Sequence, residues 1–288
     1  MHQLRIQTNA SAVERVEELL FNCGAVSISY LDAEDEPILE PPIGDHPLWS
    51  SLYIQAHFVS EEEIKLASKA LFNETAVGSQ IIVEQIRDEG WQEKFQQQFN
   101  AMQFGDLWIY PSWEDNPAPQ GLSIQLDPGL AFGTGHHPTT HLCLCWLSQT
   151  KLDDLDIIDF GCGSGILALA AALLNANHVY AVDIDPQAIT ATHQNIEKNH
   201  LANRFFTIGN INILDNIHAD MIIANILAAP LFELRDKFAQ HLKPSGVLLV
   251  SGILNDQVDS IIQHYTTNFI HLDTSSNQGW SAISFMLR

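Results

Sequence analysis

The chain has 288 residues, and its hydrophobic content of 46% is that of a globular protein. It contains no run of about 18 apolar residues, which excludes a membrane-spanning helix. Its net charge of −22 disfavours a nucleic-acid partner, because affinity for phosphate backbones comes mainly from Lys and Arg.

The acidic charge is denser in the first third of the chain. Residues 1–100 have 17 acidic and 6 basic side chains, and residues 101–288 have 18 and 7, so each part carries −11. Such a surface either attracts a basic protein partner or only keeps the protein in solution.

The amino-terminal residues lack the apolar core and small-residue cleavage site of a signal peptide, so we expect a cytoplasmic protein. In that compartment the cysteines are expected to be reduced thiols. They are Cys23, Cys143, Cys145 and Cys162.

Residues 1–87 predict an acidic α+β domain. Helices are predicted over 9–24 and 60–73, the second with Ser60 as N-cap and Glu63 completing a capping box. Strands are predicted over 2–8, 25–32, 51–59 and 79–87, with a possible short strand over 36–41. The order β-α-β-β-α-β is that of a ferredoxin-like sandwich. Since no nucleophile or metal cluster is evident in it, we expect this domain to recognise a substrate.

Residues 88–120 are predicted to be a linker or hinge. A helix is possible over 91–105, and Pro111, Pro117 and Pro119 favour a stiff, extended segment after it.

Residues 121–288 form the second predicted domain, in which strands alternate with helices. Strands are predicted over 155–160, 178–184, 205–209, 219–225 and 246–253, and helices over 166–176, 186–199, 229–242 and 256–265. This alternation predicts a parallel sheet with helices on both faces. The last two strands, 269–274 and 281–287, have only a short link and should pair antiparallel.

The strongest local motif is "DFGCGSGILALA", residues 159–170, where a strand ends in glycines and a helix begins. The glycines allow a sharp turn close to a ligand, and the helix start offers free N–H groups. The dinucleotide pattern G-x-G-x-x-G would need glycine at Ile166. The spacing Gly161, Gly163 and Gly165 therefore suits a ligand with a carboxylate rather than a pyrophosphate.

Polar residues follow the next strands at the same edge of the predicted sheet. Asp183 ends the second strand and can accept both hydroxyls of a ribose, whereas Asp185, before Pro186, suits a helix N-cap. Residues 209–216 either reach an adenine or are simply a polar loop. Asn225 ends the fourth strand at the switch point of the sheet, as a ligand contact or as a buried cap.

The loop "AFGTGHHPTT", residues 131–140, combines glycines with histidines. His137 and His141 have the i, i+4 spacing that binds zinc when both lie on a helix. Pro138 disfavours helical geometry at His137 and favours a helix that begins at the proline. We therefore expect no metal site but a lid over a ligand, with Thr140 as its main contact and with Phe132 and the histidines as weaker contacts that shape the entry.

The glycine turn, the acid at the second strand tip and the antiparallel last strand resemble the seven-stranded S-adenosylmethionine-dependent methyltransferases. The segments "LDPGLAFGTGHHPTT", "DFGCGSGILA", "VDIDPQAI" and "ANILAAPL", in this order, are similar to the bacterial family that methylates ribosomal protein L11. The resemblance implies a Rossmann-like seven-stranded methyltransferase sheet over 121–288, preceded by the smaller ferredoxin-like domain for substrate recognition.

The resemblance also implies a cofactor, S-adenosylmethionine, and its contacts. Thr140, Gly161 and Asp183 match the family's cofactor positions, with Gly163 and Phe132 beside them, and Asn225 matches the position near the transferred methyl group. Asn225 is the residue that we expect to act in catalysis.

The implied reaction is methylation of lysine ε-amino groups of ribosomal protein L11, up to trimethylation, with its N-terminal α-amino group as a further target. The sequence Asn225-Ile226-Leu227 departs from the Asn-Pro-Pro-aromatic pattern of base and glutamine methyltransferases. We expect a monomer that needs no nucleic acid or membrane. A methyltransferase of another protein or small molecule, and a non-catalytic cofactor-binding ribosome-assembly factor, remain alternatives.

Overall fold

The computed structural model describes residues 2–34, 47–72, 81–85, 99–127, 133, 135–202, 204 and 206–288. The chain divides into two compact units, Met1–Glu93 and Lys94–Arg288. Each unit encloses its own hydrophobic core. None of the described helices is long and apolar enough to cross a membrane.

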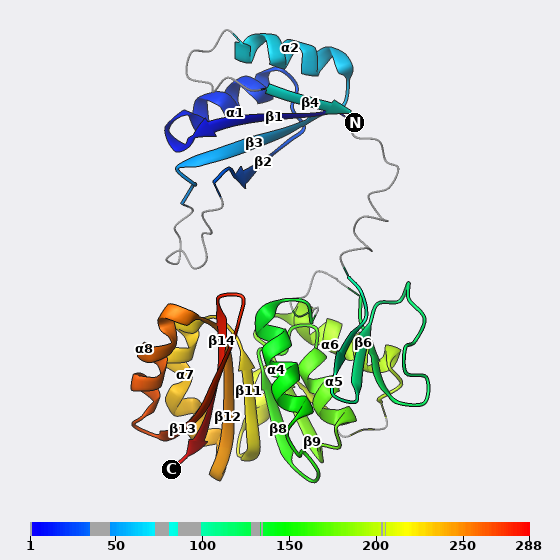
Figure 1. Ribbon diagram of the computed structural model, residues 1–288, viewed down its shortest axis with the longest axis vertical. Helices are drawn as coiled ribbons and strands as arrows, with labels where there is room; N and C mark the ends of the chain where they lie inside the picture. The colour runs from blue at the N-terminus through cyan, green and yellow to red at the C-terminus, as the bar shows by residue number, and fades with distance from the viewer. Residues whose placement is uncertain are drawn as a thin grey trace. The chain divides into compact units, whose positions relative to one another are not determined.

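The first unit is a four-stranded antiparallel sheet with two helices (Figure 1). Its elements are β1 (His2–Asn9), α1 (Val13–Asn22), β2 (Ser27–Asp32), β3 (Ser51–Phe58), α2 (Glu61–Phe72) and β4 (Ile81–Gln85). The strand order β2-β3-β1-β4 confirms the ferredoxin-like fold. Alternate residues of β1, such as Leu4 and Ile6, are fully buried against the helices, as the alternating pattern predicts.

The capping box predicted for the second helix is present. The backbone N–H of Glu63 donates to Ser60 Oγ at 3.2 Å, and the N–H of Ser60 donates to Glu63 Oε2 at 3.0 Å. The possible extra strand over 36–41 lies outside the described residues.

The second unit contains a seven-stranded sheet and a smaller three-stranded sheet. Its elements are β5 (Met102–Phe104), β6 (Leu107–Tyr110), β7 (Leu122–Gln125), α4 (Pro138–Ser148), β8 (Asp156–Phe160), α5 (Ile166–Leu173), β9 (His178–Val182), α6 (Pro186–Lys198), β10 (Phe206–Gly209), the 3₁₀ helix η2 (Ile211–Leu214), β11 (Ala219–Asn225), α7 (Ala228–His241), β12 (Leu242–Leu254), α8 (Val258–Tyr265), β13 (Phe269–Asn277) and β14 (Trp280–Leu287).

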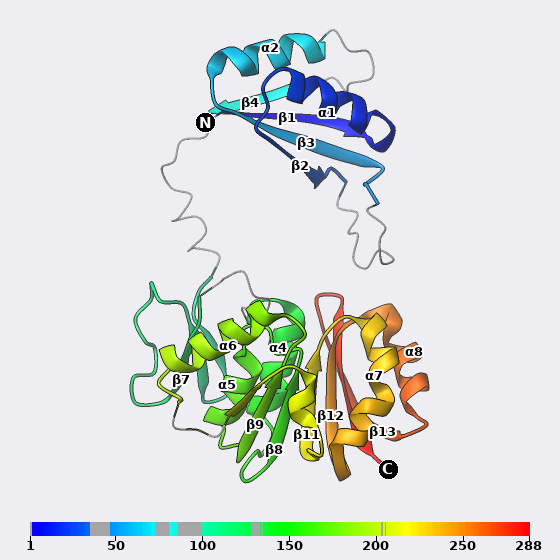
Figure 2. The ribbon, with the colours of Figure 1, turned by 180° about the vertical axis from the view of Figure 1, so that it is seen from behind.

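The strand order β10-β9-β8-β11-β12-β14-β13 confirms the Rossmann-like methyltransferase sheet. The strands from β10 to β12 are parallel, while β14 is antiparallel to both β12 and β13, as predicted for the last two strands. Figure 2 shows this sheet from behind, with α7 beside β11 and β12.

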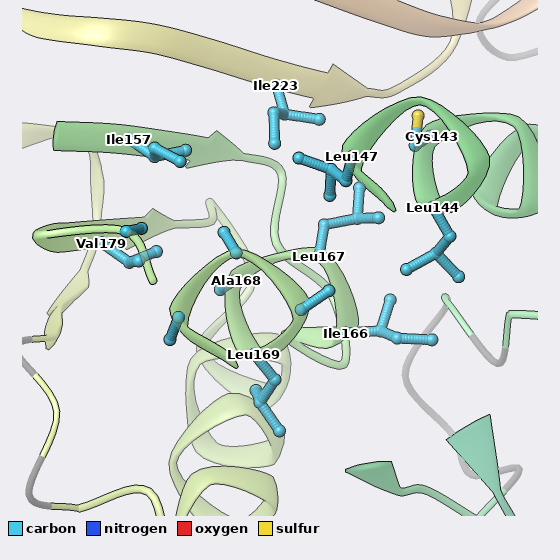
Figure 3. Packing of buried hydrophobic residues seen from close by; sticks show 14 of the residues in the cluster. Cys143, Leu144, Leu147, Ile157, Ile166, Leu167, Ala168, Leu169, Val179 and Ile223 are labelled. Atoms are coloured by element: carbon cyan, nitrogen blue, oxygen red, sulfur yellow. The ribbon is translucent and has the colours of Figure 1, made fainter. Parts of the chain in front are cut away.

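Alternating residues of the strands divide between two cores, one on each face of the sheet. Ile157 and Ile223 face α4 and α5, whereas Ile158, Ile222 and Ala224 face α7 and α8. Figure 3 shows the first core, where Leu147 of α4 and Leu167 of α5 meet strand residues. Because both faces of these strands are buried, their sequences are continuous apolar runs.

The prediction of a helix over 91–105 is wrong at its carboxyl end, because Met102–Phe104 form strand β5. Residues 91–98 lie outside the described residues. Gly105 and Asp106 make a two-residue turn, so that Phe104 pairs with Leu107 in a hairpin. Phe104, Leu107 and Ile109 are buried in the core beneath α4 and α5. Burial of these side chains against residues distant in the sequence therefore outweighs the local helix propensity of the segment.

Lys243 joins the amino ends of two central strands, at the edge of the sheet opposite to the ends of β8 and β11. Its Nζ lies 3.1 Å from Asp156 Oδ2 and 2.7 Å from Asp220 Oδ2. Burial alone would raise the pKa of Asp156, but hydrogen bonds from Asn177 and Lys243 lower it below its ordinary value.

We expect Lys243→Met to lower the free energy of unfolding by about 0.5–1 kcal/mol at pH 7, the scale of a partly exposed pair. Because the pKa of Asp156 is depressed in the folded state, its stabilising contribution is present above the unfolded pKa of about 3.9 and is lost as the pH falls through the folded value. Urea unfolding from pH 7 to pH 3 measures the difference between wild type and variant, which should shrink at the acidic end. A constant difference would contradict the linkage.

Candidate functional site

A cavity of about 680 Å³ opens at the carboxyl edge of the parallel strands, within the size range of small-molecule sites. Its walls include Gly161 after β8, Asp183 after β9, Asn225 at the end of β11, Gly252 of β12 and Trp280 at the start of β14. The first turn of α4 contributes a further part of the wall. This edge contains the switch point between β8 and β11, where open α/β sheets bind ligands.

Gly161 allows two turns of the chain to meet at the floor of the cavity. Its φ is +79°, and a Cβ atom there would lie 2.5 Å from Ile226 Cγ2. The N–H of Gly161 donates to the carbonyl of Val182 at 2.8 Å, which ties the turn to β9. Only glycine combines this backbone conformation with this close approach.

Asp183 is held between the glycine turn and the start of α6. Its Oδ2 accepts from the N–H of Gly163 at 3.0 Å, and its Oδ1 accepts from the N–H of Asp185 at 3.0 Å. Asp185 itself caps α6, accepting from the N–H of Gln187 at 2.8 Å, as predicted. The carboxylate of Asp183 is therefore fixed at the cavity wall and keeps lone pairs for a ligand hydroxyl.

Asn225 and Thr140 meet in the cavity although they are 85 residues apart. Asn225 Nδ2 donates to Thr140 Oγ1 at 3.1 Å, and Thr140 is fully buried in the first turn of α4. The other end of the amide, Asn225 Oδ1, is buried without a hydrogen-bond partner in the described part of the chain. A buried acceptor of this kind is costly unless a ligand satisfies it.

Asp159 is a buried acid that the sequence analysis did not single out. Its Oδ2 accepts from the N–H of Ala168 at 3.0 Å, behind the glycine turn. Burial and the nearby charge of Asp183 raise the pKa of Asp159 to about 7, although the Ala168 hydrogen bond opposes the rise. An acid inside the apolar run "DIIDF", directly before the glycines, was the available signal.

Cys162 lines the cavity but is not a nucleophile. Burial, together with the neighbouring carboxylate of Asp159, raises the pKa of its thiol to about 12. All four cysteines are free.

His136, His137 and His141 contact three different aromatic rings. His136 meets Phe99 at 4.9 Å between ring centroids, and His141 meets Phe104 at 4.9 Å. His137 meets Trp280 at 5.1 Å and caps α4, which begins at Pro138 as predicted. Within the described ranges, no group of three or more His, Cys, Asp or Glu side chains could hold a metal ion.

The structure thus brings most of the predicted site residues together. Thr140, Gly161, Gly163, Asp183 and Asn225 all line the one cavity. Phe132 lies outside the described residues. Of the segment 209–216, Ile211 lines the cavity, while Asn210 caps η2 by accepting from the N–H of Asn212 at 3.0 Å. Trp280, Gly252 and Ile226 are lining residues that sequence reasoning did not assign to a site.

Gly252→Ala tests how tightly the cavity floor is packed. A Cβ atom at Gly252 would lie 2.1 Å from the carbonyl oxygen of Ile226, and the φ of +86° is itself unfavourable for alanine. We expect a loss of about 3 kcal/mol or more in the free energy of unfolding, measured in urea.

Gly279→Ala is the matched control, because Gly279 has a φ of +84° and nothing within 4 Å of an added Cβ. It should lose only the cost of the backbone conformation, roughly 1–2 kcal/mol. Equal losses in the two variants would show that the contact with Ile226 adds nothing.

The comparisons with known proteins agree with this geometry. A family model described as ribosomal protein L11 methyltransferase matches residues 1–288. The ribosomal protein L11 methyltransferase of Photorhabdus laumondii is 41% identical over 285 residues, 98% of this chain and 96% of the relative. That of Legionella pneumophila (strain Lens) is 43% identical over 275 residues, 95% and 94% of the two chains. The crystal structure of a ribosomal protein L11 methylase from Lactobacillus delbrueckii subsp. bulgaricus has a TM-score of 0.59 and 31% identity, covering 66% of this chain and 100% of that one. The chain therefore belongs to the ribosomal protein L11 methyltransferase family, and it is a methyltransferase that uses S-adenosylmethionine.

Proposed function

We propose that the chain methylates lysine ε-amino groups of ribosomal protein L11, up to trimethylation, with the N-terminal α-amino group as a further target. The relatives are named for methylation of that protein. One observation supports an amine as the methyl acceptor. Asn225 Oδ1 is a buried hydrogen-bond acceptor at the cavity wall and has no partner among the described residues. An N–H donor of the substrate satisfies it.

The residues at the cavity fit S-adenosylmethionine. The carboxylate of Asp183 suits the ribose hydroxyls, and Gly161 lines the same cavity. The partial positive charge at the amino terminus of α5, which follows the glycine turn, favours the carboxylate of the cofactor's amino-acid part. When bound, the cofactor supplies a sulfonium methyl group that is ready for in-line displacement.

The chain's own contribution is to orient a neutral amine. A lysine has an unperturbed pKa of about 10.4, so its ammonium must lose a proton before it can act as a nucleophile. A largely apolar cavity favours the neutral form. Asn225 Oδ1, fixed by the bond from its own amide nitrogen to Thr140, accepts one amine N–H and points the lone pair toward the methyl group. Positioning of this kind accounts for much of the rate in such transfers.

In this proposal the first unit selects the protein substrate. Its helices carry an acidic surface that includes Glu14, Glu61 and Glu62. A basic, RNA-binding ribosomal protein is attracted to such a surface.

Asp183→Ala should weaken cofactor binding by about 100-fold or more, because it removes a fixed, charge-assisted acceptor from the cavity wall. Asp185→Ala is the neighbouring control: it removes a helix cap, at a cost of about 1 kcal/mol of stability, and leaves the cavity carboxylate in place. Calorimetry with S-adenosylmethionine measures both affinities. Unchanged affinity in Asp183→Ala would exclude the ribose role.

Labelled S-adenosylmethionine, mixed with the enzyme and purified ribosomal proteins, tests the substrate. We expect label on ribosomal protein L11, in lysine after hydrolysis. Residues 94–288, which contain their own two cores, should bind the cofactor but leave ribosomal protein L11 unlabelled. Full-rate labelling by residues 94–288 would contradict the recognition role of the first unit, and label only on another protein would contradict the proposed substrate.

A further inference from the structure

The sheet register places Trp280 on the same face of the sheet as Asn225, two strands away. Asn225 pairs with Ser251 of β12, and Ser251 pairs with Ala282 of β14. Trp280 lies two residues from Ala282 on the antiparallel strand, so it shares its face and lies further toward the cavity edge. Two strand spacings, roughly 10 Å, separate β14 from β11. Both side chains face α4, since Asn225 bonds Thr140 and Trp280 contacts His137.

Trp280 and His137 form an aromatic pair at the cavity wall. Their ring centroids are 5.1 Å apart, with an interplanar angle of 66°. The Nδ1 atom of His137 accepts from the N–H of Thr139 at 3.4 Å, in its role as the cap of α4. Burial lowers the pKa of His137, so its ring is neutral at physiological pH. The pair therefore presents two uncharged aromatic rings.

A stiff hairpin fixes the position of Trp280. The turn between β13 and β14 consists of Gln278 and Gly279, with φ angles of +49° and +84°, as in the tight turns that match strand twist. The side-chain nitrogen of Asn255, oriented to satisfy its neighbours, donates to the carbonyls of Gly279 at 3.2 Å and Trp280 at 3.3 Å. The indole is thus anchored at its backbone rather than carried by a loose loop.

Successive methylation changes what the acceptor amine needs from the cavity. Each transfer forms an N–C bond, breaks the C–S bond of the donor and leaves the amine with a positive charge. A proton must then pass to solvent before the next transfer. After the second transfer and its proton loss, the neutral dimethylated amine has no N–H, so Asn225 Oδ1 has nothing to accept during the third transfer or from its product. A quaternary ammonium without N–H groups is stabilised by the faces of aromatic rings.

We infer that Trp280 and His137 form the aromatic wall of the acceptor-amine subsite and determine how far methylation proceeds. This inference rests on the proposed methylation of lysine. In the first transfer Asn225 orients the amine, and in later transfers the aromatic pair replaces the lost N–H contacts and stabilises the charge that develops on nitrogen. Trp280 is accordingly a specificity-determining residue for the degree of methylation.

Intact-mass and peptide mass spectrometry of ribosomal protein L11, after reaction with the full-length enzyme, tests the inference. In Trp280→Leu we expect the ratio of trimethylated to monomethylated lysine to fall roughly tenfold, the scale of a desolvated cation–π contact. Trp280→Phe should stay close to wild type, since it keeps an aromatic face. His137→Asn keeps a good helix cap but removes a ring, and should show a smaller fall.

Leu272→Ala, on the neighbouring strand and 48% exposed, is the control and should leave the product ratio unchanged. Thermal unfolding and cofactor affinity of each variant separate a misfolded protein from a specific effect. An unchanged product ratio in a folded, cofactor-binding Trp280→Leu enzyme would overturn the inference.

A binding measurement separates this inference from the proposed function. Calorimetry with S-adenosylhomocysteine present compares Nε-trimethyl-lysine amide with lysine amide as ligands. Wild type should prefer the trimethylated compound, and Trp280→Leu should lose that preference. If wild type leaves ribosomal protein L11 unlabelled but keeps the preference, the proposed substrate fails and the aromatic subsite stands. If neither protein shows a preference, the aromatic subsite fails whatever the substrate is.

Discussion

The site depends on one packing constraint: Ile226 lies in close contact with two glycines, Gly161 and Gly252. An added Cβ would lie 2.5 Å from the Ile226 side chain at Gly161 and 2.1 Å from its carbonyl oxygen at Gly252. The chain leaving β11 can therefore turn toward α7 only because these two positions, one after β8 and one within β12, have no side chain. This close approach draws the ends of β8, β11 and β12 together and holds Asn225 at the cavity edge.

The cavity is divided into three regions of different chemistry. On the β9 side, backbone N–H groups fix the carboxylate of Asp183, so the acceptor for a ligand hydroxyl is preorganised. At the centre, Thr140 fixes the amide of Asn225. On the β14 side the wall is aromatic and uncharged. Asp159 lies behind the glycine turn, where burial and the charge of Asp183 raise its pKa to about 7.

Local sequence patterns were sufficient to predict the site residues that lie at the end of a single strand or in the turn after it. Gly161, Gly163 and Asp183 follow strand ends, and the carboxyl ends of parallel strands meet at one edge. Asn225 was found for the same reason. The strand β5 was missed because burial of Phe104 beneath α4 and α5, rather than local propensity, determines its structure.

The aromatic pair was missed for a related reason. Trp280 lies 143 positions after His137 along the chain, and nothing local to either residue predicts that their rings meet. The contact arises from the antiparallel insertion of β14 beside β12 and from the cap that His137 makes on α4. Contacts that depend on the pairing of distant segments produce no periodicity or spacing in the sequence from which they could be predicted.

The size of the cavity also limits what it can distinguish. About 680 Å³ holds a small-molecule cofactor and one extended side chain, but no folded protein. On the proposed function, Asn225 and the aromatic pair respond to the amine and to its methyl groups, and every lysine presents the same amine. Selection of one protein must then come from a surface outside the cavity. The first unit has a separate core and an acidic surface, so in this proposal it performs the selection.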